Sequence, residues 1–307
     1  MSNKVLDNSR ITKHLGQVSS YKDQYDPTLL VSEPRSNNRL HLDIHDDDLP
    51  FVGYDTWNAY EVSGLTNNGM PVAGVAKIVY PSSSKYIVES KSIKLYFNSY
   101  NMYRCGDTPE QVLESISTQS ALDLSVLLET EVKVHIHQAM GMRPTGESVM
   151  VPEAYTTLED SFDQRQLGEM IVDTYVETPG LLEPVLGYQK VGRYHSSLLK
   201  SNCRVTSQPD WGDVYVMYSG DKGVTQESLL KYIISFRDEC HFHEEICETI
   251  YKRLLDVIDP VELCVTCLYA RRGGIDINPV RATSNYALEE CGVLIDPRVL
   301  HVKTDKQ

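Results

Sequence analysis

Hydrophobic and polar positions follow two different periods along the chain. Residues 59–65 and 71–81 are rich in β-branched and small apolar side chains, and Asn67-Asn68-Gly69 between them predicts a turn that joins two strands. Residues 108–128 are predicted to form a helix, with a threonine N-cap and a proline at the first helical position. Residues 129–140 alternate like a half-buried strand.

The second half of the chain shows the same order of patterns. Residues 196–205 and 212–220 are predicted strands, 241–258 a predicted helix, and 261–273 the strand that follows it. Individual positions also correspond between the halves. At a constant offset, the matching residues of the first half are Ser92, Ile93, Tyr96, Ser99 and Tyr100, and their counterparts are Ser228, Leu229, Tyr232, Ser235 and Phe236.

A duplicated unit explains these matches, although chance similarity between two amphipathic helices would produce part of them. Two strands, a helix and further strands predict an α+β fold of two tandem units, with antiparallel sheets and helices on one face. We place the first unit at residues 51–150 and the second at 186–307, with a connector at 151–185. Residues 1–50 are polar and irregular, typical either of an arm that wraps another part of the molecule or a partner subunit, or of a partly ordered tail.

The composition narrows the class of protein. The chain has 307 residues, a hydrophobic fraction of 41% and a net charge of -14, which suits a globular protein whose surface repels nucleic acid phosphates. The polar start lacks the apolar stretch of a signal peptide, and no apolar run is long enough to predict a membrane span. We therefore expect a cytoplasmic protein without direct nucleic acid or membrane partners, with its seven cysteines as thiols rather than disulfides.

Cys203 is the main candidate nucleophile, although a lone cysteine is more often a small core residue. Its neighbours are polar, with Arg204 beside it and Asp210 further on, and partial exposure near a cation favours the thiolate. When the two repeats are aligned, Leu65 corresponds to Cys203 and Val72 to Asp210. The second unit therefore has reactive groups where the first has aliphatic ones, as expected of one catalytic and one supporting unit.

Other charged residues allow both structural and binding roles. Glu244, after His243 at the start of a predicted helix, is either an acid favoured by the helix dipole or a carboxylate that accepts two N–H bonds from a purine-like edge. Lys91 and Lys94 lie one helical turn apart, which is also typical of a solvated face. Arg271-Arg272-Gly273-Gly274 follows a predicted strand and suits either a phosphate or an exposed turn.

A metal site receives little support from the sequence. Cys264 and Cys267 form a CxxC pair not far from Cys240, His241 and His243, but positions three apart in a strand face opposite sides of a sheet. The chain contains neither a GxGxxG segment after a strand nor a P-loop, which argues against Rossmann and P-loop domains. We therefore expect no metal ligands.

A family resemblance rests on four segments in this order and spacing: VESKSIKLYFNSYN, SNCRVTSQPDWGD, FHEE and ARRGGIDINP. Together they closely resemble the 7-cyano-7-deazaguanine reductases of queuosine biosynthesis, in the long form that fuses two tunnel-fold units over roughly residues 50–285. The resemblance implies an NADPH-dependent nitrile reductase that converts 7-cyano-7-deazaguanine to 7-aminomethyl-7-deazaguanine. It also implies a homodimer and a cofactor site that is not a Rossmann domain.

The resemblance further implies a role for each motif residue. Cys203 is expected to form a thioimide with the nitrile carbon, Asp210 to donate a proton, and His243 to transfer a proton or position the substrate. The substrate-binding positions are Val88, Glu89, Ser90, His243 and Glu244. The cofactor-binding positions are Ser90, Lys91, Arg272 and Gly273.

Two other functions stay open at this point. A tunnel-fold hydrolase or cyclohydrolase acting on a purine or pterin would need metal-ligating His and Cys side chains, which Cys203 with Asp210 does not provide. A catalytically silent purine-binding scaffold would retain Glu89 and Glu244 but would not need a thiol at position 203. NADPH consumption, metal content and selective alkylation of Cys203 distinguish these alternatives.

Overall fold

The computed structural model describes residues 22–138, 154–291, 295–301, 303–304 and 306–307. In the first half of the chain, the predicted hairpin is present and starts earlier than the sequence indicates. The elements of this unit are β2 (Val52–Thr66), β3 (Pro71–Pro81), α2 (Ser90–Asn98), α3 (Pro109–Leu128) and β6 (Lys133–Gln138). Helix α3 begins as predicted, because the Thr108 hydroxyl accepts a hydrogen bond from the Gln111 amide at 3.3 Å. Residues 139 and 140 of the predicted last strand lie outside the described residues.

The second half repeats this order. Its elements are β8 (Pro184–Cys203), β9 (Pro209–Val224), α5 (Gln226–Ile234), α6 (His243–Ile258), β11 (Glu262–Tyr269) and β12 (Ile275–Ala282). The prediction of one strand over 261–273 is wrong beyond Tyr269, where the chain turns and returns as β12. Buried polar side chains such as Asp276 and Arg281 interrupt the hydrophobic pattern of β12, which explains why the pattern did not reveal it.

The duplication extends to individual hydrogen bonds. Helices α2 and α5 have the same length, and the serine at the third position of each helix makes the same hydrogen bond. The Ser92 hydroxyl donates to the Glu89 carbonyl at 2.7 Å, and the Ser228 hydroxyl donates to the Thr225 carbonyl at 3.0 Å. Glu89 and Thr225 are also the N-caps of their helices, so Glu89 occupies a position that a neutral threonine fills in the second unit.

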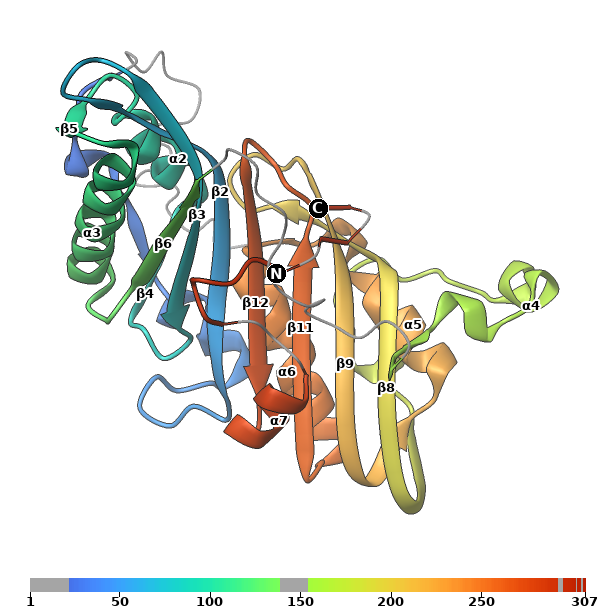
Figure 1. Ribbon diagram of the computed structural model, residues 1–307. Coiled ribbons are helices and arrows are strands. Elements are labelled where there is room, and N and C mark those ends of the chain that lie inside the picture. Colours follow the sequence, from blue (N-terminus) through green and yellow to red (C-terminus); the bar gives the residue numbers. More distant parts are fainter. Residues whose placement is uncertain (1–21, 139–153, 292–294, 302, 305) are drawn as a thin grey trace, which may run out of the picture.

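The two units share a single sheet. β12 of the second unit pairs antiparallel with β2 of the first, from Ile275 opposite Ala59 to Ala282 opposite Val52. The main path of the ten-stranded sheet runs β10-β8-β9-β11-β12-β2-β3-β6, with β5 (Arg104–Gly106) beside β2 and β7 (Thr156–Thr157) beside β8 (Figure 1). The short strand β10 (Cys240–His241) lies parallel to the end of β8.

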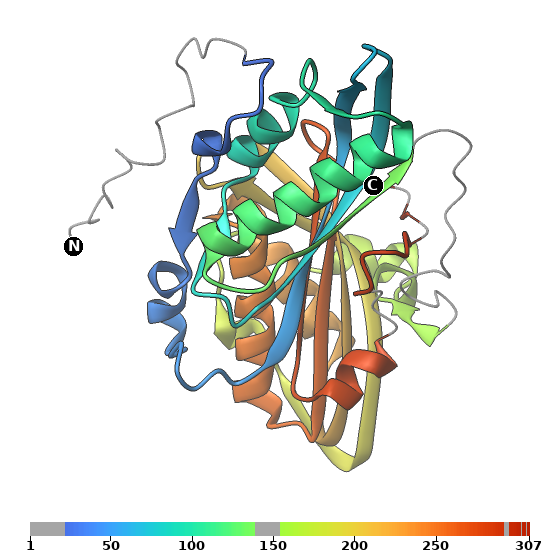
Figure 2. The same cartoon turned by 60° about the vertical axis from the view of Figure 1, so that its left-hand side comes forward.

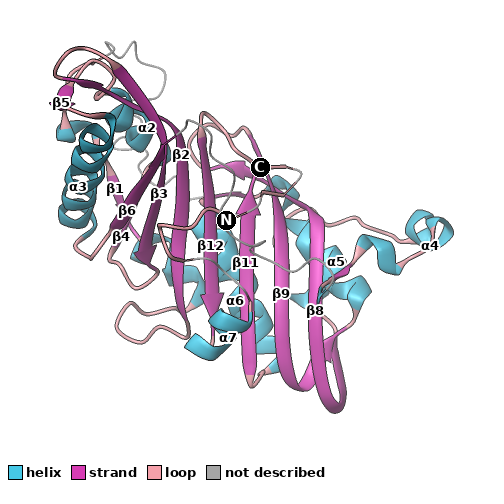
Figure 3. Ribbon diagram, in the orientation of Figure 1, coloured by secondary structure: helices cyan, strands magenta, loops and turns pink. Residues whose placement is uncertain are grey.

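The four long helices cover one face of this sheet, so the predicted class, α+β with antiparallel strands and helices on one face, is confirmed (Figures 2 and 3). The cores beneath the helices are apolar, with Trp57, Ile78 and Ile116 in the first unit and Val216 and Ile250 in the second. Burial of these side chains against the sheet fixes where each helix begins, and therefore where the helix N-termini lie.

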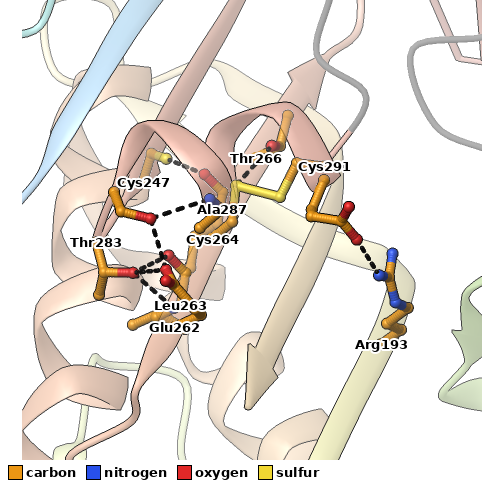
Figure 4. Close-up of a disulfide and its surroundings, with 12 residues drawn as sticks. Arg193, Cys247, Glu262, Leu263, Cys264, Thr266, Thr283, Ala287 and Cys291 are labelled. Atoms are coloured by element: carbon orange, nitrogen blue, oxygen red, sulfur yellow. Dashed lines mark hydrogen bonds and ion pairs between the residues drawn. A yellow bond between two sulfur atoms is a disulfide. The ribbon is translucent and has the colours of Figure 1, made fainter.

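A short helix, α7 (Asn285–Glu290), packs on the opposite face and carries a disulfide. Cys264 of β11 and Cys291, which ends α7, are joined there, with their Cα atoms 6.7 Å apart (Figure 4). The prediction that all cysteines are thiols is therefore wrong for this pair. The sequence did not indicate the pairing because only the packing of α7 brings Cys291 over the sheet.

Residues 22–50 pack against the molecule rather than extending from it. They include η2 (Pro27–Leu29), β1 (Ser32–Pro34), α1 (Ser36–Arg39) and η3 (Leu40–Leu42). Strand β1 pairs with β4 (Tyr86–Val88), the strand that leads directly into α2. The described part of this region therefore contacts the first unit, and its role as an arm stays a prediction.

The described part of the connector is irregular. It contains η5 (Glu159–Ser161), α4 (Gln164–Glu169) and η6 (Pro179–Leu181), and η7 (Ser235–Asp238) follows α5 in the second unit. The unit boundaries at residues 50, 150 and 185 stay a prediction. In the part of the chain that the structure describes, no helix is long and apolar enough to cross a membrane.

Candidate active site

Two adjoining cavities lie where the two units meet, on the helix-covered side. The smaller, of about 30 Å³, is lined from the first unit by Trp57, Val88, Glu89 and Ser90, and from the second mainly by Cys203, Asp210, His243, Glu244 and Arg272. The larger, of about 260 Å³, is lined by Glu89, Ser90, Lys91, Lys94, Cys203, Arg272 and Gly273, among others. Every residue predicted to bind substrate or to act in catalysis therefore lines the first cavity, and every predicted cofactor residue lines the second.

Cys203 ends β8 and stands at the boundary between the two cavities. Its amide donates to the Gln208 carbonyl at 2.8 Å, which holds the tight loop between β8 and β9. Burial opposes ionisation of the thiol, but hydrogen bonds from Thr206, from the Val205 amide and from Arg272 outweigh it and lower the pKa of Cys203. The local structure therefore favours the thiolate, the reactive form of cysteine.

Asp210 lies close to two basic side chains. Its Oδ1 is 2.7 Å from Nη1 of Arg272, and its Oδ2 is 3.3 Å from Nε2 of His243. The His243 ring stacks on Tyr269 at 3.8 Å between centroids, and its Nδ1 is buried with no hydrogen-bond partner in the described part of the chain. Strand β9 supplies Asp210, helix α6 supplies His243 and the β11–β12 turn supplies Arg272, so three separate elements meet at this carboxylate.

Two glutamates line the smaller cavity from different units. Glu89 caps helix α2, with its oxygens accepting hydrogen bonds from the Lys91 amide at 2.9 Å and the Ser92 amide at 2.7 Å. Glu244, in the first turn of α6, is 3% exposed, and its Oε1 has no hydrogen-bond partner among the residues that the structure describes. Burial and repulsion by Asp55 raise the pKa of Glu244 to about 8. Glu89 therefore has a structural role in addition to its predicted one, whereas Glu244 has an unused acceptor.

The larger cavity is bordered by cations. Lys91 and Lys94 on α2 face Arg272 across it, and the turn between β11 and β12 contributes Gly273 with a φ of 60°. At the next position, a Cβ on Gly274 would lie 2.7 Å from the Glu61 side chain, so glycine allows the turn to approach β2 closely. Sequence reasoning gave Lys94 no role; its spacing from Lys91 was visible, but the cavity that both face was not.

His241 is a further residue that the sequence did not single out as a site residue. It lines the smaller cavity and pairs with Cys203 in the β8–β10 register. Its ring nitrogens lie 2.8 Å from Glu239 and 2.9 Å from Glu245. Burial alone would lower the pKa of His241, but these two carboxylates raise it to about 9.

Comparison with known proteins identifies the family. Two family models match the chain. Residues 21–136 match the model described as "Nitrile reductase, 7-cyano-7-deazaguanine-reductase N-term", and residues 209–287 match the model described as "QueF-like protein". An NADPH-dependent 7-cyano-7-deazaguanine reductase of Legionella pneumophila strain Lens is 38% identical over 288 residues, covering 91% of this chain and 92% of the relative. The chain belongs to this reductase family.

A second member of the 7-cyano-7-deazaguanine reductases, from Legionella pneumophila strain Corby, is 36% identical and covers 93% of this chain and 94% of the relative. Among solved structures, the apo form of the archaeosine synthase QueF-Like matches 33% of this chain and 91% of that chain, with 20% identity and a TM-score of 0.26. That likeness is too weak to support a structural argument. In the described residues, no group of three or more His, Cys, Asp or Glu side chains is placed to hold a metal ion.

Proposed function

We propose that this protein reduces the nitrile of 7-cyano-7-deazaguanine to the aminomethyl group, with NADPH as reductant, as a step of queuosine biosynthesis. The observation that supports this most is the position of Cys203, where a thiol with a lowered pKa borders both a cavity with buried carboxylates and a cavity with cations. A hydrolase would need metal ligands and a silent scaffold would need no activated thiol, so the reductase agrees best with this site.

The first step would be attack of the Cys203 sulfur on the nitrile carbon, which forms a C–S bond and breaks one C–N π bond. Thiolates are strong nucleophiles near neutral pH, so this step needs no metal. The nitrile nitrogen gains a proton in the same step, and Asp210, which lines the same cavity as Cys203, would supply it. The product is a thioimide, which holds the carbon in a form that accepts hydride.

Asp210 would have to carry a proton to act in this way, although Arg272 is paired with it at 2.7 Å. Arg272 is also one of the cations that border the larger cavity. An anionic phosphate in that cavity would attract the Arg272 guanidinium and weaken its pairing with Asp210. Occupation of the cofactor site would thereby release Asp210 from its ion pair.

Substrate recognition would use the carboxylates of the smaller cavity. The pyrimidine edge of a 7-deazaguanine carries adjacent N–H donors, and an ionised carboxylate accepts two parallel hydrogen bonds from such an edge. Glu244 has the free acceptor for this role. At about 30 Å³ the cavity has room for only a few waters, so the side chains of Trp57 and Phe242 that line it would have to move apart to admit the base.

The residues around the larger cavity fit NADPH in chemistry. Lys91, Lys94 and Arg272 provide three cations for its phosphates, and a turn with a left-handed glycine allows close approach. NADPH supplies a hydride when bound, and two molecules supply the four electrons that convert nitrile to amine. Two protons enter as well, and the Cys203 thiol is regenerated when the thioimide carbon becomes an imine.

The test is NADPH oxidation on addition of 7-cyano-7-deazaguanine, measured at 340 nm against product formed. We expect two NADPH consumed per substrate with the wild type and none with Cys203→Ala. Cys240→Ala is the matched control, because Cys240 is exposed on the neighbouring strand β10 and should leave turnover unchanged. Absence of NADPH consumption by the folded wild type would refute the proposal.

A homodimer is part of the proposal. Among the described residues, the sheet ends at β6 on one side and at β8 with its short partner strands on the other, so both edges of this described sheet offer unpaired backbone groups. On β8, Leu186 and Val191 are 77% and 66% exposed, which is unfavourable for an edge strand in water. Pairing of β6 with β8 of a second copy would cover both edges. Light scattering after gel filtration should give twice the mass of one chain, and the Leu186→Asp variant should have a lower measured mass.

A further inference from the structure

Helix α6 carries Glu248 one turn after Glu244, and Glu248 belongs to a buried layer of charges. In this layer, Arg281 of β12 bridges Asp55 of β2 and Glu248 of α6, at 2.8 Å from each. Arg35 pairs with Asp55 and lies 3.8 Å from Glu248. Glu244 and Glu248 are one helical turn apart, so they share a face of α6.

The N-terminal segment supplies two of the cations in this layer. Arg35 is 2% exposed, with its Nε donating to the Ser84 hydroxyl at 3.0 Å, and its guanidinium lies 5.7 Å from the Tyr80 ring centre. Arg39 is 1% exposed and lies 2.8 Å from Glu248, with Asp46 as a second partner toward the surface. Two arginines are buried here at a large desolvation cost, which only pairing with these carboxylates offsets.

The same segment is bonded to the other wall of the cavity. The Glu89 amide donates to the Val31 carbonyl at 2.9 Å, and the Ser92 hydroxyl accepts from the Val31 amide at 3.1 Å. Asn38 accepts a hydrogen bond from Arg204, the residue that follows Cys203. The N-terminal segment therefore contacts the residues behind Glu244, Glu89 and Cys203 without lining the cavity itself.

We propose that Arg35 is a positioning residue for Glu244: it pairs with Asp55 in the buried charge layer, and so lets the free acceptor of Glu244 bind the paired N–H donors of the substrate. This inference rests on the proposed function for the identity of the ligand. Arg35 does not line the cavity and lies in a segment without a catalytic motif, but it would contribute to substrate binding.

The charges that face Glu244 determine the sign of the effect. Asp55 opposes ionisation of Glu244, whereas Arg35 and Arg281 favour it, and the outcome is a pKa of about 8. Loss of Arg35 would remove a favourable charge and leave Asp55 with one arginine fewer, so the carboxylate would form only at higher pH. Further ionisable groups lie around the Glu244 carboxylate. They are Tyr80 of β3, Tyr269 of β11, Glu248 and His243 of α6, and three residues that line the same cavity, Glu89, Asp210 and His241.

The experiment measures binding of 7-cyano-7-deazaguanine to the full chain by calorimetry between pH 6 and 9, in a Cys203→Ala background that prevents the covalent step. Because binding needs the Glu244 carboxylate, affinity should increase about tenfold per pH unit below the midpoint and level off above it. Arg35→Met should move the midpoint to higher pH and weaken binding at pH 7 about tenfold, and Arg35→Lys should lie between. Asp55→Asn should move the midpoint to lower pH.

Arg39→Met is the matched control, since it removes a buried arginine of the same segment from the same partner, Glu248, but not from Asp55. It should lower stability comparably and leave the midpoint in place. Glu244→Gln should abolish the pH dependence. If Arg35→Lys and Arg35→Met bind with the wild-type midpoint, or if Arg39→Met moves it equally, the role of Arg35 is wrong.

This outcome is separable from the proposed function. Turnover of NADPH by the wild type tests the reaction, whereas the midpoint of binding tests Arg35. An active wild type with an unmoved midpoint in Arg35→Met would overturn the inference alone. Binding with the expected shifts, but without any NADPH oxidation by the wild type, would overturn the reaction alone.

Discussion

Nη1 of Arg272 lies 2.7 Å from Oδ1 of Asp210, and Arg272 also helps to lower the pKa of the Cys203 thiol. One exposed arginine thus acts on both the expected nucleophile and the expected acid. Its position on the β11–β12 turn places it at the boundary of the smaller and the larger cavity. The surroundings of both groups therefore depend on a side chain that an anionic cofactor is expected to attract.

Replacement of Arg272 should therefore change the reactivity of Cys203. In Arg272→Met the thiol loses one hydrogen bond that lowers its pKa, so the midpoint of iodoacetamide alkylation should move to higher pH. Each unit of that shift reduces the thiolate fraction about tenfold below the midpoint. Arg271→Met is the control, because Arg271 lies over the Tyr60 ring instead. An unchanged alkylation profile would show that Arg272 does not act on Cys203.

Asp210 should be needed for turnover but not for binding. Asp210→Asn removes the proposed proton donor, and loss of general acid catalysis costs about 10²- to 10⁴-fold in kcat. The matched control is Asp213→Asn on the same strand, since Asp213 contacts Ser197 and His195 rather than the cavity. Stopped-flow measurement of NADPH oxidation provides kcat. Equal losses in both variants would point to damage to β9 instead.

Lys94 should contribute to cofactor affinity. It borders the larger cavity beside Lys91 and has Glu61 as its ion-pair partner at 3.0 Å. Lys94→Ala should raise the KM for NADPH about tenfold, the order expected for loss of one charged contact to a phosphate, with a smaller effect on kcat. Lys85→Ala, an exposed lysine paired with Glu129, should leave both constants unchanged. A wild-type KM in Lys94→Ala would remove Lys94 from the cofactor site.

His241 should make stability depend on pH. The raised pKa of about 9 means that the folded protein holds a proton that the unfolded chain releases near pH 6.5. The contribution, at most a few kcal/mol, is therefore complete below about pH 6.5 and is lost as pH rises through about 9. Urea unfolding of His241→Asn and wild type should differ most at pH 6 and least at pH 10.

His135→Asn provides the comparison for this titration. Burial lowers the pKa of His135, so this residue destabilises the folded protein at low pH, where the unfolded chain binds the proton more readily. Its effect on the free energy of unfolding therefore does not become less favourable as pH rises. A difference between wild type and His241→Asn that stays constant from pH 6 to pH 10 would contradict the ion pairs with Glu239 and Glu245.

Local patterns were enough to place several elements and the main candidate residues. Helix α3 begins at Pro109, as predicted, because a threonine cap and an N-terminal proline act within one turn of chain. Ser92 of α2 and Ser228 of α5 matched because duplication preserves sequence and hydrogen bonding together. The motifs around Cys203 and Glu244 were visible for the same reason, since they are short and contiguous.

The sequence by itself determined the two-unit α+β fold and the family to which the chain belongs, because periodicity, caps and short motifs are local properties. Only the tertiary structure decided that both units line the smaller cavity and that Cys264 forms a disulfide with Cys291. It also decided that Arg35 and Arg39 are buried, in a segment that the sequence described as a polar arm. A buried arginine cannot be distinguished from an exposed one by its neighbours in sequence. Its burial is stabilised by carboxylates such as Glu248, which come from distant elements and meet it only when the sheet has formed.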